Sequence, residues 1–269
     1  MKKFKNVLIA SDFDGTLKND EGEISKETRD AIARFIGEGG YFTVSTGRTH
    51  QGFHLYDPGY INAPVLLANG ALAYDYAKKK IAFFDGIGDE GIEVLRKVRD
   101  LFPKASIEMY PFGQTFAINL TDDTERHFTD QFIEFEVIDD PTSAPRPWQK
   151  AMIGCDRDTS PKVQAFLKSF SKDPSFLPTT GNFIEILKKG VNKGTGLHKL
   201  ADYLGVSREN CYAVGDGYND AEMLTAAKAA FVPENGEPEA LAVATHIVPS
   251  NNNHAVAHVI EILDSIYPG

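Results

Sequence analysis

The chain has 269 residues, of which 42% are hydrophobic and 25% are charged, and its formal net charge at pH 7 is −10. This composition is typical of a soluble globular protein and excludes a long disordered or fibrous chain, while the length allows a large core with an inserted module. The acidic balance disfavours duplex DNA and anionic lipid as main partners, because phosphate groups attract basic surfaces. A small anionic substrate stays possible where a cleft is locally positive or holds a metal.

The N-terminal stretch MKKFKNVLIAS starts with basic residues, but its apolar run is only as long as a strand and meets charge at Asp12. It therefore fails as a secretory signal. No other segment approaches the roughly 18 apolar residues that a membrane span requires, so we expect a cytoplasmic protein with no membrane partner. Cys155 and Cys211 are too few for a disulfide framework, and their apolar contexts predict buried structural thiols.

The first third of the chain alternates strand and helix. Residues 6–11 (NVLIAS) and 40–47 (GYFTVSTG) are predicted as buried strands, and residues 25–36 between them as a helix with Ser25 as its N-cap. Residues 63–75 supply a third apolar run. Continuous apolar strands separated by helices are typical of a parallel sheet that is covered on both faces.

The pattern changes between residues 83 and 187, where we expect a separate α+β layer. Its predicted elements are helices over 89–102, 122–133 and 158–170 and strands over 115–121, 135–139 and 150–155, with Ser160 as N-cap and Pro161 first in the last helix. Residues 182–190 then return the chain to the first module.

Strand and helix alternate again after residue 190. The predicted helices cover 193–204, 218–227, 237–243 and 255–266, and the predicted strands cover 211–215, 229–233 and 246–249. The sequence therefore predicts an α/β fold with a doubly wound, Rossmann-like parallel sheet from residues 1–82 and 188–269. Residues 83–187 would form an inserted α+β cap domain.

Polar clusters follow three of the predicted core strands. In an open parallel sheet, ligands bind beyond the carboxyl ends of the strands, so these clusters should converge on one edge. Four carboxylates in one crevice would repel one another, and a divalent cation resolves this; hard oxygen ligands favour Mg²⁺. The clusters are Asp12 and Asp14, then Thr46, Gly47 and Arg48, and then Asp216 through Asp220.

Four short stretches, DFDGTL, STGR, VNKG and GDGYND, occur in this order at these strand ends. Together they resemble the four motifs of the haloacid dehalogenase (HAD) superfamily. The insertion between the second and third motifs resembles the Cof-like phosphatases, which carry a large α/β cap there (type C2/IIB). Any one motif is weak, but four in order over nearly the whole chain are specific.

The resemblance implies a role for each matching residue. Asp12 would be the nucleophile that accepts the phosphoryl group, and Asp14 the general acid and base. Thr46 would donate a hydrogen bond to the phosphoryl oxygens, and Lys193 would neutralise both the nucleophile and the phosphate. Mg²⁺ would be held by Asp12, the Asp14 carbonyl, Asp216 and Asp220, and the substrate by Thr46, Gly47, Arg48, Lys193 and Asn219.

Several assignments stay open. Arg48 is as compatible with a surface ion pair as with anion binding, and Asn251 stands in a stretch that departs from the family pattern, with Ala255 in place of glycine. His254 and His258 are more typical of a solvated helix surface than of a zinc site. The cap residues that could face a substrate are Tyr110, Phe112, Phe116, Arg126, Arg146, Trp148, Lys150 and Glu185, and the sequence singles out none of them.

The sequence thus predicts a Mg²⁺-dependent phosphatase that hydrolyses a small phosphorylated metabolite, such as a sugar phosphate, through an aspartyl-phosphate. A phosphomutase of the same fold is the nearest alternative, although Arg126, Arg146 and Arg157 are scattered rather than clustered. A sugar-phosphate sensor with little turnover is the alternative from another class. The substrate and the oligomeric state cannot be read from the sequence.

Overall fold

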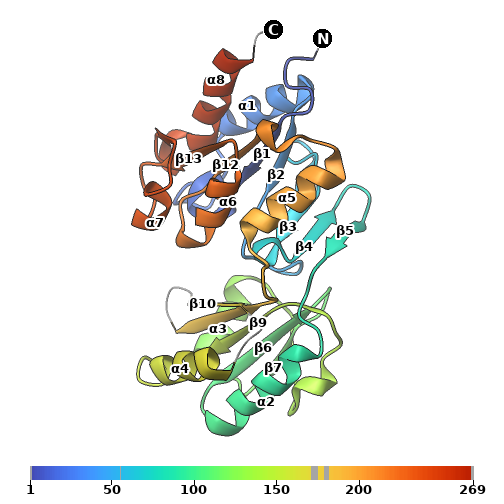
Figure 1. Ribbon diagram of the computed structural model, residues 1–269, viewed down its shortest axis with the longest axis vertical. Helices are drawn as coiled ribbons and strands as arrows, with labels where there is room; N and C mark the ends of the chain where they lie inside the picture. Colours follow the sequence, from blue (N-terminus) through green and yellow to red (C-terminus); the bar gives the residue numbers. More distant parts are fainter. Residues whose placement is uncertain (1, 55, 171–174, 179–181, 268–269) are drawn as a thin grey trace. The chain divides into compact units, whose positions relative to one another are not determined.

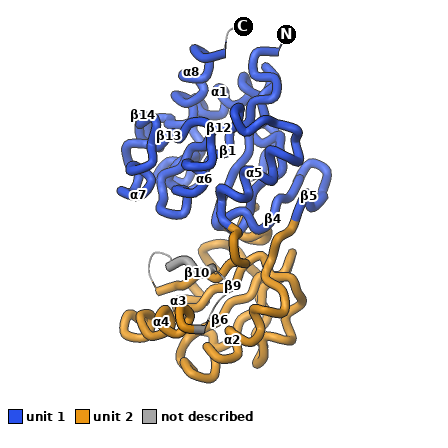
Figure 2. The backbone as a smooth tube through the Cα atoms, viewed as in Figure 1, with its two compact units in different colours: residues 1–47, 55–83, 192–269 blue, residues 48–54, 84–191 orange. Residues whose placement is uncertain are grey.

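The computed structural model describes residues 2–54, 56–170, 175–178 and 182–267. The chain divides into two compact units: unit 1 comprises Met1–Gly47, Leu55–Phe83 and Asn192–Gly269, and unit 2 comprises Arg48–His54 and Phe84–Val191 (Figure 2). The boundaries predicted from the sequence assigned residues 48–54 and 188–191 to the core domain, whereas the structure has them in unit 2. Residues 48–54 join unit 2 because their backbone and side chains bond to it, as in the 3.0 Å hydrogen bond from His50 N to Gln149 Oε1.

Unit 1 is built on a parallel sheet in the order β14-β13-β12-β1-β2 (Figure 1). Its strands are β1 (Leu8–Ser11), β2 (Tyr41–Val44), β12 (Cys211–Val214), β13 (Ala229–Pro233) and β14 (His246–Val248). The chain winds from β1 to β2 on one side and from β12 to β14 on the other, so the direction reverses between β1 and β12. This confirms the predicted α/β fold, and a reversal of this kind marks the usual ligand crevice.

The helices of unit 1 pack in pairs. Helix α1 lies against α8, and α5 lies against α6, with a short α7 beside the latter (Figure 1). Leu8 and Ala10 of β1 join a buried apolar cluster with Leu197 and Leu200 of α5. The helices are α1 (Lys26–Gly37), α5 (Lys193–Leu204), α6 (Ala221–Ala226), α7 (Pro238–Leu241) and α8 (Ala255–Ile266).

Helix starts follow the capping residues. Ser25 accepts a hydrogen bond from Thr28 N at 3.2 Å, as its N-cap role predicts. Asn192 caps α5 by accepting from Thr195 N at 2.8 Å, while the Thr195 hydroxyl accepts from Asn192 N. The second cap fixes Lys193 as the first residue of α5.

The third apolar run does not form one strand of the parallel sheet. It folds into β3 (Val65–Leu67) and β4 (Leu72–Asp75), which pair in antiparallel fashion and form a separate sheet with β5 (Lys80–Phe84). The chain reverses because Ala68, Asn69 and Gly70 have φ values of 47°, 52° and 90°. An isolated bridge between Ser45 and Leu66 is parallel.

Unit 2 contains a sheet in the order β10-β11-β9-β6-β7-β8. Buried apolar side chains such as Val94 of α2 and Val163 of α4 form its core with Ile107 and Ile153 of the sheet. The strands are β6 (Ser106–Pro111), β7 (Phe116–Ile118), β8 (Glu136–Val137), β9 (Trp148–Gly154), β10 (Ser175–Pro178) and β11 (Phe183–Leu187), and the helices are α2 (Glu90–Leu101), α3 (Asp122–Asp130) and α4 (Ser160–Phe170).

Four of the described strands were not predicted: β5, β6, β10 and β11. Residues 182–190 were expected to return the chain to the first module, but β11 pairs with β9 and β10 in unit 2. Strand β6 lies in the middle of its sheet, yet it carries Ser106 and Glu108, which interrupt the apolar pattern that would identify a buried strand. Helix α4 begins at Ser160 itself rather than after it. Helix α6 is shorter than predicted, because Tyr218–Asp220 forms a tight turn ahead of it.

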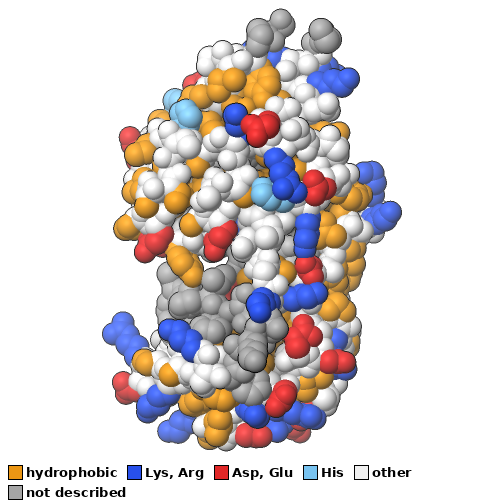
Figure 3. Space-filling view, in the orientation of Figure 1, with side chains coloured by type: hydrophobic (Ala, Val, Ile, Leu, Met, Phe, Trp, Pro, Cys, Tyr) orange, Lys and Arg blue, Asp and Glu red, His pale blue; other side chains and the backbone are white. Residues whose placement is uncertain are grey.

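The surface carries charges of both signs. On the face seen in Figure 3, Lys and Arg side chains are interspersed with Asp and Glu. Within the part of the chain that the structure describes, no helix combines the length and the apolarity that crossing a membrane takes.

Candidate active site

The turn after β1 begins the site. Asp12 N donates to the Val214 carbonyl at 2.8 Å, which ties the tip of β1 to the tip of β12. Gly15 has φ +85°, and a Cβ there would lie 2.6 Å from Asp216 Oδ2. Only glycine allows the turn to approach Asp216 so closely.

Three aspartates meet at the tips of β1 and β12. One carboxylate oxygen from each of Asp12, Asp216 and Asp220 lies within 4.8 Å of the others. Asp220 is fully buried and Asp12 is 7% exposed. Asp12 lies about 200 positions before Asp216 and Asp220 in the chain, and the parallel pairing of β1 with β12 brings them together.

Lys193 supplies a positive charge inside this cluster. Its Nζ lies 2.6 Å from Asp12 Oδ1 and 2.6 Å from Asp220 Oδ1, and the side chain is fully buried. Burial opposes its charge, but Asp12 and Asp220 more than offset that effect, so the Lys193 pKa lies above its ordinary value. Lys193 is therefore a permanent ammonium in the site.

The carboxylates remain under-compensated. Burial raises the pKa of Asp216 to about 6, helped by Asp220, and burial together with Asp220 and Asp216 raises the pKa of Asp12 against the opposing effect of Lys193. Two buried acids, Asp12 and Asp220, and the half-buried Asp216 share one lysine. An all-oxygen donor set with excess negative charge fits a hard divalent cation, which would favour the ionised carboxylates.

Asp14 departs from the expected arrangement. Its carboxylate is not part of the three-aspartate cluster, and its side chain is 49% exposed. Lys18 Nζ donates to Asp14 Oδ1 at 3.3 Å. Among the described residues, the cluster of acids close enough to share an ion comprises Asp12, Asp216 and Asp220 without the Asp14 side chain. That all four carboxylates face one crevice stays a prediction.

Asn69 connects the STGR motif, which contains Thr46 and Gly47, with the GDGYND motif, which contains Asn219. Thr46 is buried, and its carbonyl accepts from Asn69 N at 3.0 Å. The Asn69 Oδ1 in turn accepts from Asn219 Nδ2 at 3.0 Å, and a Cβ on Gly47 would lie 3.4 Å from that oxygen. Asn219 thus contacts Asn69 in addition to standing beside Asp220. Sequence reasoning missed Asn69, for which the only signal is the dipeptide Asn-Gly in the turn.

Two expected residues contact other groups. Arg48 belongs to unit 2, where its Nη1 donates to the Gly52 carbonyl at 3.2 Å. Asn251 is 7% exposed and donates at 3.0 Å to the Lys18 carbonyl and to Asp20 Oδ1. These hydrogen bonds of Asn251 hold the chain that follows the DFDGTL motif.

Thr16 is a site residue that the sequence analysis did not single out. Its hydroxyl donates to Asp216 Oδ1, which lowers the Asp216 pKa against the effect of burial. Thr16 is 1% exposed. The signal lay in the motif DFDGTL, because a hydroxyl four residues after Asp12 can reach a carboxylate on the next strand.

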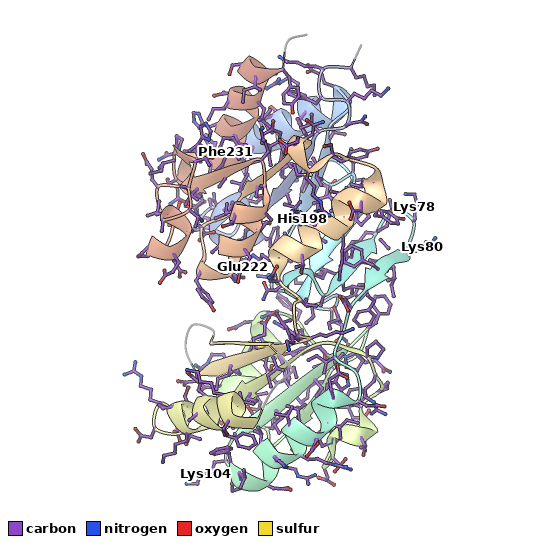
Figure 4. All side chains as sticks on the ribbon, in the orientation of Figure 1. Lys78, Lys80, Lys104, His198, Glu222 and Phe231 are labelled. Carbon is purple, nitrogen blue, oxygen red and sulfur yellow. The ribbon has the colours of Figure 1, made fainter. Side chains whose placement is uncertain are left out.

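The other candidate nucleophiles and ligands have structural roles. Cys155 and Cys211 are free and buried, as predicted, and burial raises the pKa of Cys211 to about 11. A groove of about 460 Å³ between α5 and α6 is lined by His198 and Glu222 among others (Figure 4). His198 Nε2 lies 3.1 Å from the Ala226 carbonyl, so this ring links the two helices.

The predicted cap candidates lie in unit 2 in different environments. Lys150 donates to Glu185 Oε2 at 2.9 Å, and Tyr110 donates to the buried carboxylate of Glu108. Arg146 pairs with Asp89 at 2.7 Å. Trp148 and Phe116 are buried, whereas Phe112 and Arg126 are exposed.

The family of haloacid dehalogenase-like hydrolases matches residues 9–260. The chain belongs to this family. The match covers every residue of the acidic cluster and Lys193, and it confirms the superfamily, the Cof-like phosphatase type and the enzyme class that the four motifs indicated.

Individual relatives align with nearly the whole length of this HAD hydrolase. The 5-amino-6-(5-phospho-D-ribitylamino)uracil phosphatase YitU of Bacillus subtilis (strain 168) is 27% identical over 96% of the chain and 97% of its own length. A haloacid dehalogenase-like hydrolase from Bacteroides thetaiotaomicron has a similar fold, with a TM-score of 0.85, 24% identity and coverage of 96% and 99%. The HAD subclass IIB sugar phosphatase BT4131 gives a TM-score of 0.83, 16% identity and coverage of 95% and 98%.

Proposed function

We propose that this protein is a Mg²⁺-dependent phosphatase that releases inorganic phosphate from a small phosphorylated metabolite through an aspartyl-phosphate on Asp12. The observation that carries the proposal is the contact of Lys193 with Asp12 and Asp220 inside a cluster of three carboxylates at the sheet edge. This arrangement offers a nucleophile, a fixed positive charge and oxygen ligands in one place.

In the first step an Asp12 carboxylate oxygen attacks phosphorus. The bond from phosphorus to the ester oxygen breaks, and Asp14 gives its proton to the leaving alcohol. Lys193 stays protonated and offsets the negative charge on Asp12 and on the phosphoryl oxygens. The main chain of Thr46 is held at the neighbouring strand end by the hydrogen bond from Asn69 N, and its hydroxyl would donate to a phosphoryl oxygen.

In the second step a water molecule attacks the phosphorus of the aspartyl-phosphate. Asp14, now a carboxylate, takes a proton from this water, and the bond from phosphorus to Asp12 breaks. Phosphate leaves and both aspartates return to their starting states. Splitting the hydrolysis in this way replaces one very slow reaction with two faster ones.

Asp12, Asp216 and Asp220 would hold the divalent cation, with the Asp14 carbonyl as a further oxygen ligand. The cation would balance the charge of the carboxylates and of the substrate phosphate. Thr16 orients Asp216 for this role through its hydroxyl.

The names of two similar proteins support a phosphorylated polyol or sugar as the substrate class. YitU is named for a phosphoribityl compound, and BT4131 is named a sugar phosphatase. That residues 83–187 determine the choice of substrate stays a prediction. A phosphomutase would need free cations for a second phosphate, and among the described arginines Arg146 and Arg126 are already paired with Asp89 and Asp123.

A panel of phosphate monoesters tests the proposal. The purified protein should release phosphate from sugar and polyol phosphates with MgCl₂ and not with EDTA. Asp12→Asn should reduce the rate at least about a thousandfold and abolish phosphate labelling of the protein. Saturable binding of a sugar phosphate without turnover would instead favour the sensor, and substantial activity of Asp12→Asn would remove this residue as nucleophile.

A further inference from the structure

Lys18 forms an ion pair with Asp14. Its Nζ is 3.3 Å from Asp14 Oδ1, and its side chain is only 14% exposed, against 49% for Asp14. The two residues stand four apart, but residues 13–17 are not a regular helix, because Asp14 and Gly15 have non-helical backbone angles. The contact arises from a tight turn that the hydrogen bond from Lys18 N to the Phe13 carbonyl closes at 3.0 Å.

The Lys18 side chain is restrained along its length. Its Nζ lies 5.1 Å from the centroid of the Phe13 ring. An exposed lysine would lose rotamer entropy on pairing, which is why surface ion pairs contribute little. A lysine that already packs on an aromatic ring loses less, so this pair can hold Asp14 in one orientation.

Two asparagines from distant loops hold the backbone of the same turn. Asn251 donates to the Lys18 carbonyl at 3.0 Å, and Asn235 Nδ2 donates to the Gly15 carbonyl at 2.9 Å. Asn251 N also donates to Asn235 Oδ1 at 3.0 Å, which links the two. The middle and the end of the turn that carries Asp14 are therefore attached to one pair of side chains, which follow β13 and β14.

We propose that Lys18, held through its carbonyl by Asn251, is a positioning residue that orients the Asp14 carboxyl group toward the leaving-group oxygen. This inference rests on the proposed phosphatase function and adds a residue outside the four motifs. The hydrolysis rate of an ester whose leaving oxygen must be protonated depends on the position of the Asp14 carboxyl group. The hydrolysis rate of an ester with a good leaving group does not.

The test measures kcat and KM of the full chain with MgCl₂ on two esters, glycerol 1-phosphate and p-nitrophenyl phosphate. Lys18→Met, which keeps the aliphatic stem, should lower kcat for glycerol 1-phosphate about tenfold and leave p-nitrophenyl phosphate within about twofold. Asn251→Ala should act in the same direction, and Lys18→Arg should restore most of the activity.

Lys26→Met is the matched control. Lys26 pairs with Asp30 at the same spacing of four residues, but both side chains are largely exposed at 81% and 65%, and the pair lies in α1. This variant should behave as the wild type on both esters. Thermal melts of each variant show whether the fold is retained.

Equal loss of kcat on both esters, or a change in KM alone, would overturn the positioning role. The same holds if Lys18→Met matches the wild type while Asp12→Asn is inactive; in that case the proposed function stands and only Lys18 is excluded. If the wild type releases phosphate from neither ester nor from the monoester panel, the proposed function fails and this inference fails with it.

Discussion

Lys193 Nζ and Asp12 Oδ1 are 2.6 Å apart, although the two residues are separated by 181 positions in the chain. Lys193 begins α5 and Asp12 directly follows β1, and the two elements pack together through the apolar cluster around Leu8 and Leu197. The core of unit 1 thus fixes the charge geometry of the site. Removing either partner leaves a buried charge without its compensation.

Lys193→Met should destabilise the metal-free protein by about 3 to 5 kcal/mol, because Asp12 and Asp220 lose their buried counter-ion. Urea unfolding in EDTA measures this loss. Lys199→Met, at an exposed position on the same helix, should change the unfolding free energy by less than about 0.5 kcal/mol. A similarly small loss for Lys193→Met would show that the folded state does not need Lys193 to compensate the charge of the three carboxylates.

Asp216 should make stability depend on pH. Its pKa is raised from 3.8 to about 6, so the folded state keeps this proton more firmly than the unfolded state does. Between about pH 4 and pH 6 the folded state binds more protons, and the unfolding free energy falls as pH rises through this window. Above about pH 6 this contribution of Asp216 to the unfolding free energy is fully lost, and the loss amounts to at most about 3 kcal/mol.

Asp216→Asn removes this contribution. Unfolding of both proteins in EDTA at pH 4 to 7 measures it together with the effect of Asp216 on the pKa of Asp12, while groups that do not interact with Asp216 cancel in the difference. The variant should gain stability relative to the wild type as pH rises, and MgCl₂ should reverse the order at pH 7. Parallel pH profiles for the two proteins would contradict the raised pKa.

Thr16→Val should weaken the response to magnesium. The hydroxyl that orients Asp216 is lost, and removing a residue that holds a metal ligand typically costs about 10 to 100-fold in metal affinity. Titration of activity with MgCl₂ gives the concentration for half-activation. Thr225→Val, whose hydroxyl donates to the Ala221 carbonyl in α6, serves as control. An unchanged half-activation concentration in Thr16→Val would show that Asp216 is oriented by other contacts.

Gly196→Ala should destabilise unit 1 by about 1 to 3 kcal/mol. A Cβ at this position would lie 2.8 Å from Gly70 Cα, and a backbone atom cannot move aside as a flexible side chain can. Gly37→Ala, where a Cβ would meet nothing within 4 Å, should be neutral or slightly stabilising. Thermal or urea unfolding compares them, and equal stability of both variants would mean that α5 shifts freely away from the turn at Gly70.

The strands of the parallel sheet in unit 1 could be predicted because each is a short, mainly apolar run, and the start of α1 could be predicted because a recognisable cap precedes it. Ser25 caps α1 as expected, and the parallel sheet formed from both ends of the chain. The motif residues were also identifiable, since a carboxylate directly after a buried strand is visible in sequence. The family match over residues 9–260 agrees with them.

Other features depended on contacts that no local pattern encodes. The cluster formed from Asp12, Asp216 and Asp220 without the Asp14 side chain, and residues 48–54 joined unit 2 through hydrogen bonds to residues such as Gln149. Asn69 reached Asn219 only because the chain reverses between β3 and β4.

The sequence by itself determined the elements and the residue types at the strand ends, because these follow from short-range periodicity and capping. Only the tertiary structure decided which polar groups touch, such as Thr16 with Asp216 and Asn251 with Lys18. A hydrogen bond requires its partners to be within about 3.5 Å, and the packing of distant segments sets that distance.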